Sequence, residues 1–336
     1  MSTLLTEHQP NFGVYHGGIH AVDPRNYRQK SFSDLWLPLR EKRWQYIGVY
    51  SDSVIAGLAV FHGGYLGNIF VYVYDRASGL FWEQERTAVM AAGIRVDRNV
   101  HTGVVSYMAE DERIRIDNDL EHHSRRVDVK LKHDGRTVDM RLEIKDDWSK
   151  LLPHQVVTPT AKGQFSFTHK AAGLPIFGSI LIGDRRIELN PESSRAAIDY
   201  TVGYHDHKTN WNWASAAGQT DDGTQIGLNL VHPVHHPKFH ENVLWINGQP
   251  LQLGEAQFSY GDPSKRDIWN IQSHCGRVKL DFQPLGLRAQ NINYGLLSSR
   301  FFQPFGLYSG TVIGNDGQSY RIRDMPGVAE EHCARW

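Results

Sequence analysis

The chain has 336 residues, of which 40% are hydrophobic and 11% aromatic, so a disordered or fibrous chain is excluded. Its 36 Lys and Arg nearly balance its 37 Asp and Glu, which gives a formal net charge of −1 and argues against nucleic acid as a partner. This length predicts two domains, and the longest apolar runs fall far short of the ~20 residues that a membrane-spanning helix needs.

Antiparallel strands are predicted through the first half of the chain. Short runs rich in Val, Ile, Tyr and Phe are separated by Gly, Ser and Asp, at residues 44–50, 54–61, 68–74 and 80–85. Residues 136–145 alternate between apolar and polar side chains, and residues 127–131 alternate in the same way. The region from about 44 to 147 is therefore interpreted as an antiparallel meander.

A domain boundary is predicted after this meander. Residues 148–163 lose the alternation and contain two prolines, a composition typical of a connector. We therefore assign an N-terminal domain to residues 1–150 and a C-terminal domain, with the main site, to residues 165–336. Residues 191–197 are the best candidate for a short helix. Strands resume beyond the connector, at residues 177–182, 186–189, 198–204, 211–217, 225–231, 243–246, 256–260, 278–282, 305–313 and 319–323.

The fold class that these elements predict is all-β. The pattern contains no long amphipathic helix and no βαβ rhythm, which excludes Rossmann and TIM-barrel architectures. A series of antiparallel strands hides its edges by closing on itself, so we expect two antiparallel β-barrels in tandem. A barrel of about eight strands leaves room for one ligand, and we expect a hydrophobic small molecule.

Residues 200–213 hold the densest group of chemically active side chains. On a strand, Tyr200, Val202, Tyr204 and Asp206 share one face. If this face lines a barrel interior, desolvation raises the pKa of the Asp206 carboxyl and makes it a candidate general acid. The alternative is that Asp206 ends the strand or pairs with Lys208 at the rim.

Histidine is unusually frequent, with 18 in the chain. His205 and His207 point the same way on a strand, a spacing by which β-barrel metalloproteins offer two metal ligands. A cupin would need a Glu where Trp211 and Asn212 stand, so we expect neither a metal nor another cofactor. A His-liganded metal enzyme is kept as an alternative, in which further ligands come from the segment with His232, His235, His236 and His240.

Aromatic side chains and a second carboxylate follow in the sequence. Trp211 and Trp213 share one strand face, where indole rings either belong to a core or stabilise a developing cation. Glu241, Asn242 and Trp245 come after the histidine-rich segment. We assign these five residues to substrate binding, and the alternative for Glu241 is a surface acid beside a hairpin.

A family resemblance rests on six short motifs. They are Gly203-Tyr-His-Asp-His207, Trp211-x-Trp213, Asp222-Gly223, Gly227-Leu-Asn229, Glu241-Asn-x-Leu-Trp245 and the closing Gly327-Val-x-Glu-x-His332-x-Ala-Arg-Trp336. With these motifs the chain resembles, over nearly its whole length, a bacterial family catalogued as domain of unknown function 2804. It is also similar to the calycin-like group that contains carotenoid 1,2-hydratase, AttH proteins and certain survival factors. That group implies two lipocalin-like barrels in tandem.

The resemblance to the hydratase also implies a chemistry. An acid protonates an isolated alkene, and aromatic side chains shelter the resulting cation until water adds. Carried over to this chain, the acid is Asp206 with His205 or His207 assisting, and the aromatic groups are Tyr204, Trp211 and Trp213. Lys208-Thr-Asn210 stands where relatives often place an aromatic residue and Gly.

These observations favour a cofactor-independent lyase or isomerase. It would hydrate, dehydrate or isomerise a hydrophobic, unsaturated and possibly isoprenoid molecule by acid–base chemistry. The alternative is a non-catalytic lipid or isoprenoid binder of the same fold, because both need the same apolar pocket. The first residues lack a cationic stretch followed by an apolar one, and Cys275 and Cys333 suit free thiols, so we expect a cytoplasmic protein.

Overall fold

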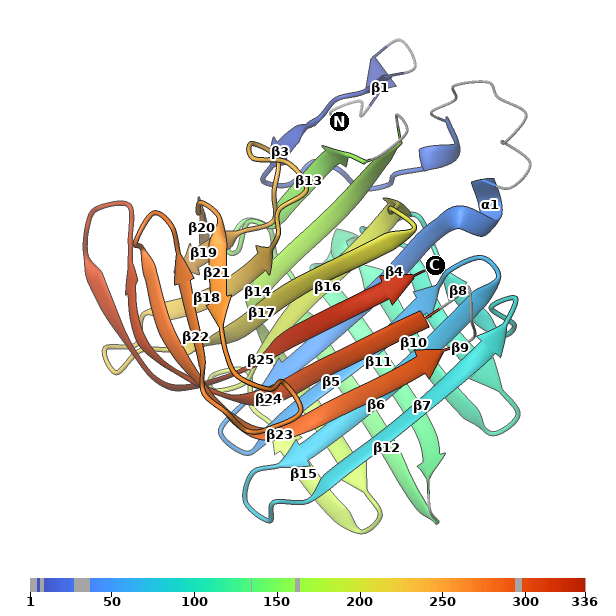
Figure 1. Cartoon of the computed structure of the whole chain (residues 1–336). Coiled ribbons are helices and arrows are strands. Elements are labelled where there is room, and N and C mark those ends of the chain that lie inside the picture. Colours follow the sequence, from blue (N-terminus) through green and yellow to red (C-terminus); the bar gives the residue numbers. More distant parts are fainter. Residues whose placement is uncertain are drawn as a thin grey trace.

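Two curved antiparallel sheets dominate the computed structural model of the chain, which describes residues 5–6, 9–26, 37–133, 135–160, 164–293 and 298–335 (Figure 1). The larger sheet has 14 strands and the second has 9, while β1 (Leu5–Thr6) and β2 (Gln9–Pro10) form a separate pair. Within these described ranges, helix is confined to short turns such as α1 (Leu37–Arg40). The all-β prediction is therefore confirmed. Among the described helices, none is long and apolar enough to cross a membrane.

The larger sheet runs in the order β7-β6-β5-β4-β16-β14-β12-β11-β10-β9-β8, and β13 and β15 also pair with β14 while β3 pairs with β13. It curls so far that Arg86 on β7 donates a 2.8 Å hydrogen bond to Glu112 on β10, which makes the sheet a nearly closed barrel. Its strands are β3 (Gly13–Tyr15), β4 (Glu41–Tyr50), β5 (Val54–His62), β6 (Leu66–Asp75), β7 (Phe81–Val89), β8 (Ile94–Val96), β9 (Val104–Ala109), β10 (Glu112–Asp119), β11 (Ser124–His133), β12 (Arg136–Lys145), β13 (His154–Pro159), β14 (Phe165–Ile182), β15 (Arg185–Leu189) and β16 (Arg195–Tyr204).

The second sheet forms a half-barrel in the order β20-β19-β18-β17-β25-β24-β23-β22-β21. Its centre is the last described strand, which pairs with β17 on one side and β24 on the other. Its strands are β17 (Lys208–Gln219), β18 (Gln225–His232), β19 (Val243–Ile246), β20 (Gln249–Gln252), β21 (Ala256–Ser259), β22 (Trp269–Ser273), β23 (Val278–Asn293), β24 (Ser298–Ile313) and β25 (Ser319–Arg335).

The two sheets meet on a set of strands that we call the shared wall, made of β4, β5, β6, β14 and β16. In Figure 1 the strands β23–β25 lie in front of the blue strands of this wall. Neighbouring residues of β4 face opposite sides: Gln45 hydrogen-bonds Asn118 inside the first barrel, whereas Tyr46 contacts Trp213 of the second sheet. On β6, Tyr72 stacks on Phe305 of the second sheet. The outer face of the first barrel is therefore the floor of a second chamber.

Polar side chains fill part of the interior of the first barrel. Arg125, fully buried, donates a 2.7 Å hydrogen bond to Asp146 and also bonds Asn118. The two ring nitrogens of His169 form hydrogen bonds with the side chains of Arg125 and Gln155, at 3.4 and 3.1 Å. Each buried group thus finds partners that offset its lost hydration.

The structure departs from the sequence prediction around residues 148–204. The segment expected to be a connector contains β13, and the segment expected to be a short helix, 191–197, is a turn followed by the start of β16. Both strands hydrogen-bond within the larger sheet, so the chain passes to the second sheet only at residues 205–207. The assignment of folding domains to residues 1–150 and 165–336 stays a prediction.

The contact between the shared wall and the second sheet predicts a stability effect. A Cβ atom on Gly227 of β18 would lie 2.0 Å from the carbonyl oxygen of Ala172 on β14. We expect Gly227→Ala to lower the free energy of unfolding by ~1–3 kcal/mol, the cost of overpacking. Gly254→Ala is the control, because its nearest neighbour would lie 3.8 Å away. Denaturant unfolding measures both, and an unchanged midpoint for Gly227→Ala would contradict the close approach.

Candidate functional site

A cavity of about 210 Å³ lies between the shared wall and the second sheet. Side chains from β4, β5 and β6 line one side, and side chains from β17, β18, β23, β24 and β25 line the other. Its surface is mainly apolar, and aromatic rings contribute much of it, from Trp44, Tyr46, Phe61, Phe70, Trp211, Trp213 and Phe301. Such a surface suits a small apolar molecule.

Strand register assembles a charged cluster on the shared wall. Asp199 of β16 stands directly opposite Lys170 of β14 and, on its other side, opposite Tyr46 of β4. The Lys170 ammonium is 2.6 Å from Asp199 and 2.9 Å from Glu241, which comes from the segment before β19. Thr168 donates a 3.3 Å hydrogen bond to Glu241. Two carboxylates therefore share one buried ammonium at the cavity surface.

The environment separates the pKa values of these groups. Burial raises the pKa of Asp199, and the positive charge of Lys170 offsets this only in part, so the pKa lies above its ordinary value. Burial also raises the pKa of Glu241, but Lys170 and Thr168 outweigh it and the pKa falls below its ordinary value. Lys170 keeps its proton, because the two carboxylates outweigh the burial that lowers its pKa. Glu241 is thus the more fully ionised carboxyl of the pair, although its lower pKa makes it the weaker base.

Glu330 is the most unusual acid of the cavity. It lies on β25 directly opposite Trp213 and is 6% exposed. Trp211 donates a 2.7 Å hydrogen bond to one carboxyl oxygen, and Gln303 donates a 2.8 Å hydrogen bond to the other. Burial raises the pKa of Glu330 to about 7, although both hydrogen bonds act in the opposite direction. A carboxyl group with such a pKa holds a transferable proton near neutral pH.

Two neutral histidines and one arginine add to the polar surface of the cavity. Burial lowers the pKa of His205 and of His332 to about 3. Arg288 is 1% exposed and its guanidinium lies 3.9 Å from the ring centre of Phe70. Its nitrogens approach Glu85 at 2.6 Å and Glu83 at 3.2 Å. This cation is therefore already paired with carboxylates.

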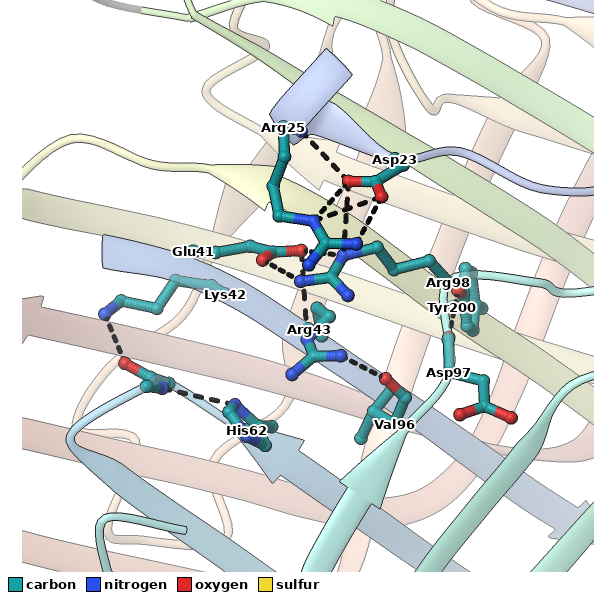
Figure 2. A network of polar contacts seen from close by, with 12 residues as sticks. Asp23, Arg25, Glu41, Lys42, Arg43, His62, Val96, Asp97, Arg98 and Tyr200 are labelled. Atoms are coloured by element: carbon teal, nitrogen blue, oxygen red, sulfur yellow. Dashed lines mark hydrogen bonds and ion pairs between the residues drawn. The ribbon is translucent and has the colours of Figure 1, made fainter. Parts of the chain in front are cut away.

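The cavity lies on the face of β16 opposite to the one we predicted. Asp199 lines the cavity and marks the face of β16 toward the second sheet. Tyr200, on the opposite face, donates a 2.6 Å hydrogen bond to the backbone carbonyl of Asp97 in the first barrel. Tyr204 lies on the same face of β16 as Tyr200 and is buried opposite Glu41 of β4. Figure 2 shows the network at this end of β16, in which Arg98 bridges Glu41 and Asp23.

The position that we predicted for Asp206, on an apolar face inside a barrel, is also wrong. Strand β16 ends at Tyr204, so alternation does not continue to Asp206, whose side chain is exposed. His207 is exposed too, while His205 turns into the cavity, so the His205 and His207 rings do not point the same way. The described part of the chain contains no group of three or more His, Cys, Asp or Glu arranged to hold a metal ion.

The residues assigned to substrate binding divide into two sets. Trp211, Trp213 and Glu241 line the cavity as expected. Asn242 is fully buried and accepts a 2.6 Å hydrogen bond from the Val231 backbone, and the Trp245 indole donates one of 2.8 Å to the Leu152 carbonyl. These two side chains support the backbone around the cavity.

Sequence reasoning missed Glu330, Lys170 and Asp199. A signal for Glu330 was present in the closing motif Gly327-Val-x-Glu-x-His332, whose alternation places Glu330 and His332 on the face that carries Val328. Lys170 and Asp199 gave no such signal, because only the pairing of β14 with β16 brings them together.

Fold and cavity together define an all-β, calycin-like protein whose architecture suits small-molecule binding. The sequence matches the family described as domain of unknown function (DUF2804) over residues 7–336, and the chain belongs to that family. This confirms the family resemblance of the motifs, although Trp336 lies outside the described residues. No curated protein matches the sequence.

The chain is similar to solved structures at low sequence identity. Kievitone hydratase from Nectria haematococca is 10% identical, with a TM-score of 0.51 over 87% of this chain and 88% of that one. A putative AttH from Nitrosomonas europaea is 12% identical, with a TM-score of 0.48 over 93% of this chain and 98% of that one. The similarity to the hydratase shows the fold.

The raised pKa of Glu330 predicts a pH-dependent stability. Folding raises this pKa from 4.5 to about 7, so the folded state holds a proton that the unfolded state loses between these values. Stability from this group is present below pH 4.5 and is lost as the pH rises to 7, on the order of 3 kcal/mol in total. We expect urea unfolding to show most of this loss between pH 5 and pH 8 in the wild type, and not in Glu330→Gln. An equal change in both proteins would contradict it.

Proposed function

We propose that this protein is a cofactor-independent lyase or isomerase that moves protons and water at a carbon–carbon double bond of a hydrophobic, isoprenoid-like molecule. The observation that carries the proposal is the Glu330 carboxyl, buried in an aromatic cavity with a pKa near neutrality. A cytoplasmic location and independence of cofactors are parts of the same proposal. The shared fold with kievitone hydratase supports it at the level of architecture.

Glu330 acts as the general acid in the proposed mechanism. Its proton passes to one alkene carbon, and the two electrons of the π bond form the new C–H bond, which leaves a cation on the other carbon. Trp211 and Gln303 hold both carboxyl oxygens and stabilise the carboxylate that remains. The indole faces of the cavity favour the transient positive charge.

Glu241 acts as the base. Lys170 and Thr168 hold it as a carboxylate, so it can take a proton from the water that attacks the cation, which gives an alcohol. Removal of a proton from a neighbouring carbon would instead shift the double bond. Dehydration follows the same steps in reverse, with Glu330 receiving the alkene proton.

Deuterium exchange tests the acid without knowledge of the substrate. In D₂O, reversible protonation places deuterium on alkenes, and mass spectrometry detects it on a panel of isoprenoid alcohols and prenylated phenols. We expect Glu330→Gln to reduce incorporation by roughly a hundredfold, the scale of a lost general acid. Glu331→Gln is the matched control, because the neighbouring Glu331 accepts hydrogen bonds from Tyr260 and Arg300 and does not line the cavity. Equal incorporation by wild type and Glu330→Gln would remove Glu330 from the mechanism.

The pH profile of exchange provides a second test. The protonated form of Glu330 is the acid, and its fraction falls as the pH rises through about 7. We expect the rate to be nearly constant between pH 5.5 and 6.5 and to fall about tenfold per pH unit above the pKa. A rate that rises between pH 7 and 9 would contradict this assignment. Tight binding of panel members without exchange would favour the non-catalytic binder.

A further inference from the structure

Carboxylates outnumber the basic groups in both charged clusters at the cavity. Lys170 faces Asp199 and Glu241, and Arg288 faces Glu83 and Glu85. With these carboxylates ionised, each cluster carries one negative charge more than its single cation. Arg335 also lines the cavity, but it is a partly exposed residue at the end of β25.

Two indoles of the aromatic surface hydrogen-bond acidic side chains of the cavity. Trp211 donates its N–H to Glu330 at 2.7 Å, and Trp44 hydrogen-bonds Asp199. Donation to an ionised carboxylate moves electron density into the indole ring, which strengthens its attraction for a cation over its face; for Trp211 this applies above the pKa of Glu330, about 7. Both rings line the cavity together with Trp213, whose centre lies 6.0 Å from the Lys170 ammonium.

We propose that the cavity binds lipophilic organic cations, in which a substituted ammonium group is attached to an apolar body. The ammonium group would lie among Trp44, Trp211, Asp199 and Glu241, and the apolar body along Phe61 and Phe301. Aromatic rings with nearby carboxylates recognise quaternary ammonium groups through cation–π attraction and charge. The inference goes beyond the proposed reaction, because it requires the cavity and its charges but no proton transfer.

A quaternary ammonium ligand distinguishes such a site from a general apolar pocket. A quaternary ammonium cannot donate an N–H hydrogen bond, so it needs only aromatic faces and a negative field. A neutral molecule of the same shape keeps the dispersion contacts and loses the electrostatic attraction. The ratio of the two affinities therefore reports the charge of the cavity and not its size.

The experiment compares benzyltrimethylammonium with neopentylbenzene, its uncharged isostere, on the full chain. Tryptophan fluorescence follows binding at pH 7.5 and low ionic strength. We expect the cation to bind at least ~10-fold more tightly than the isostere. Equal affinities, or no detectable binding of the cation, would overturn the inference. Neither result would touch the deuterium-exchange test, so the two proposals fail separately.

Two single substitutions test whether the carboxylates of the cavity attract the cation. Glu241→Gln leaves Lys170 paired with Asp199, and Asp199→Asn leaves it paired with Glu241, so each retains a buried ion pair. We expect either change to lower the affinity for the cation by ~5–10-fold and to leave the affinity for the isostere unchanged. Circular dichroism checks that both variants fold. Glu188→Gln, on an exposed residue of β15, should change neither affinity. If both variants bound the cation and the isostere equally more weakly, the substitutions would have changed the shape of the cavity, and this would contradict the proposal.

Discussion

The shared wall is the constraint on which the rest of the molecule depends. Its strands have no solvent face: β5 is buried over Val54–Val60, and β16 is buried at nearly every position. The side chain of each residue must therefore pack either in the first barrel or in the second chamber. A register slip by one residue would exchange the two sets, placing Tyr200 toward the cavity and Asp199 in the first barrel. Register on this wall is thus fixed from both sides.

This double role explains how buried charge is tolerated beside an aromatic surface. Lys170 and Asp199 are held by backbone pairing, so little side-chain reorganisation is needed to keep them together. Isolated charges at this depth would cost several kcal/mol each, and the cluster offsets that cost through ion pairs and the threonine hydroxyl. Glu330, which faces them from the other sheet, has no cationic partner at hydrogen-bond distance among the contacts described, and its elevated pKa follows from that difference.

Local patterns were sufficient to predict the fold class but not the site. Strands such as Arg136–Lys145, with one dry face, alternate visibly and were found. The first half of β14 was missed, because residues Phe165–Leu174 are buried on both sides and show no alternation. Strand parity on β16 correctly separated two faces, yet an apolar face is equally expected in a packed barrel interior and in a ligand pocket. Glu330 and Lys170 become neighbours of one cavity only through pairing between distant segments.

The position of β25 in the second sheet has a consequence for the order of assembly. This strand lies between β17 and β24, and its partner β17 precedes it by more than a hundred residues. During synthesis β17 emerges early and presents an unpaired edge until β25 arrives to cover it. The first barrel can close before that moment, whereas the second chamber cannot. Until β25 forms, the β17 edge is therefore open to pairing with strands of other chains, an aggregation hazard of long-range β pairing.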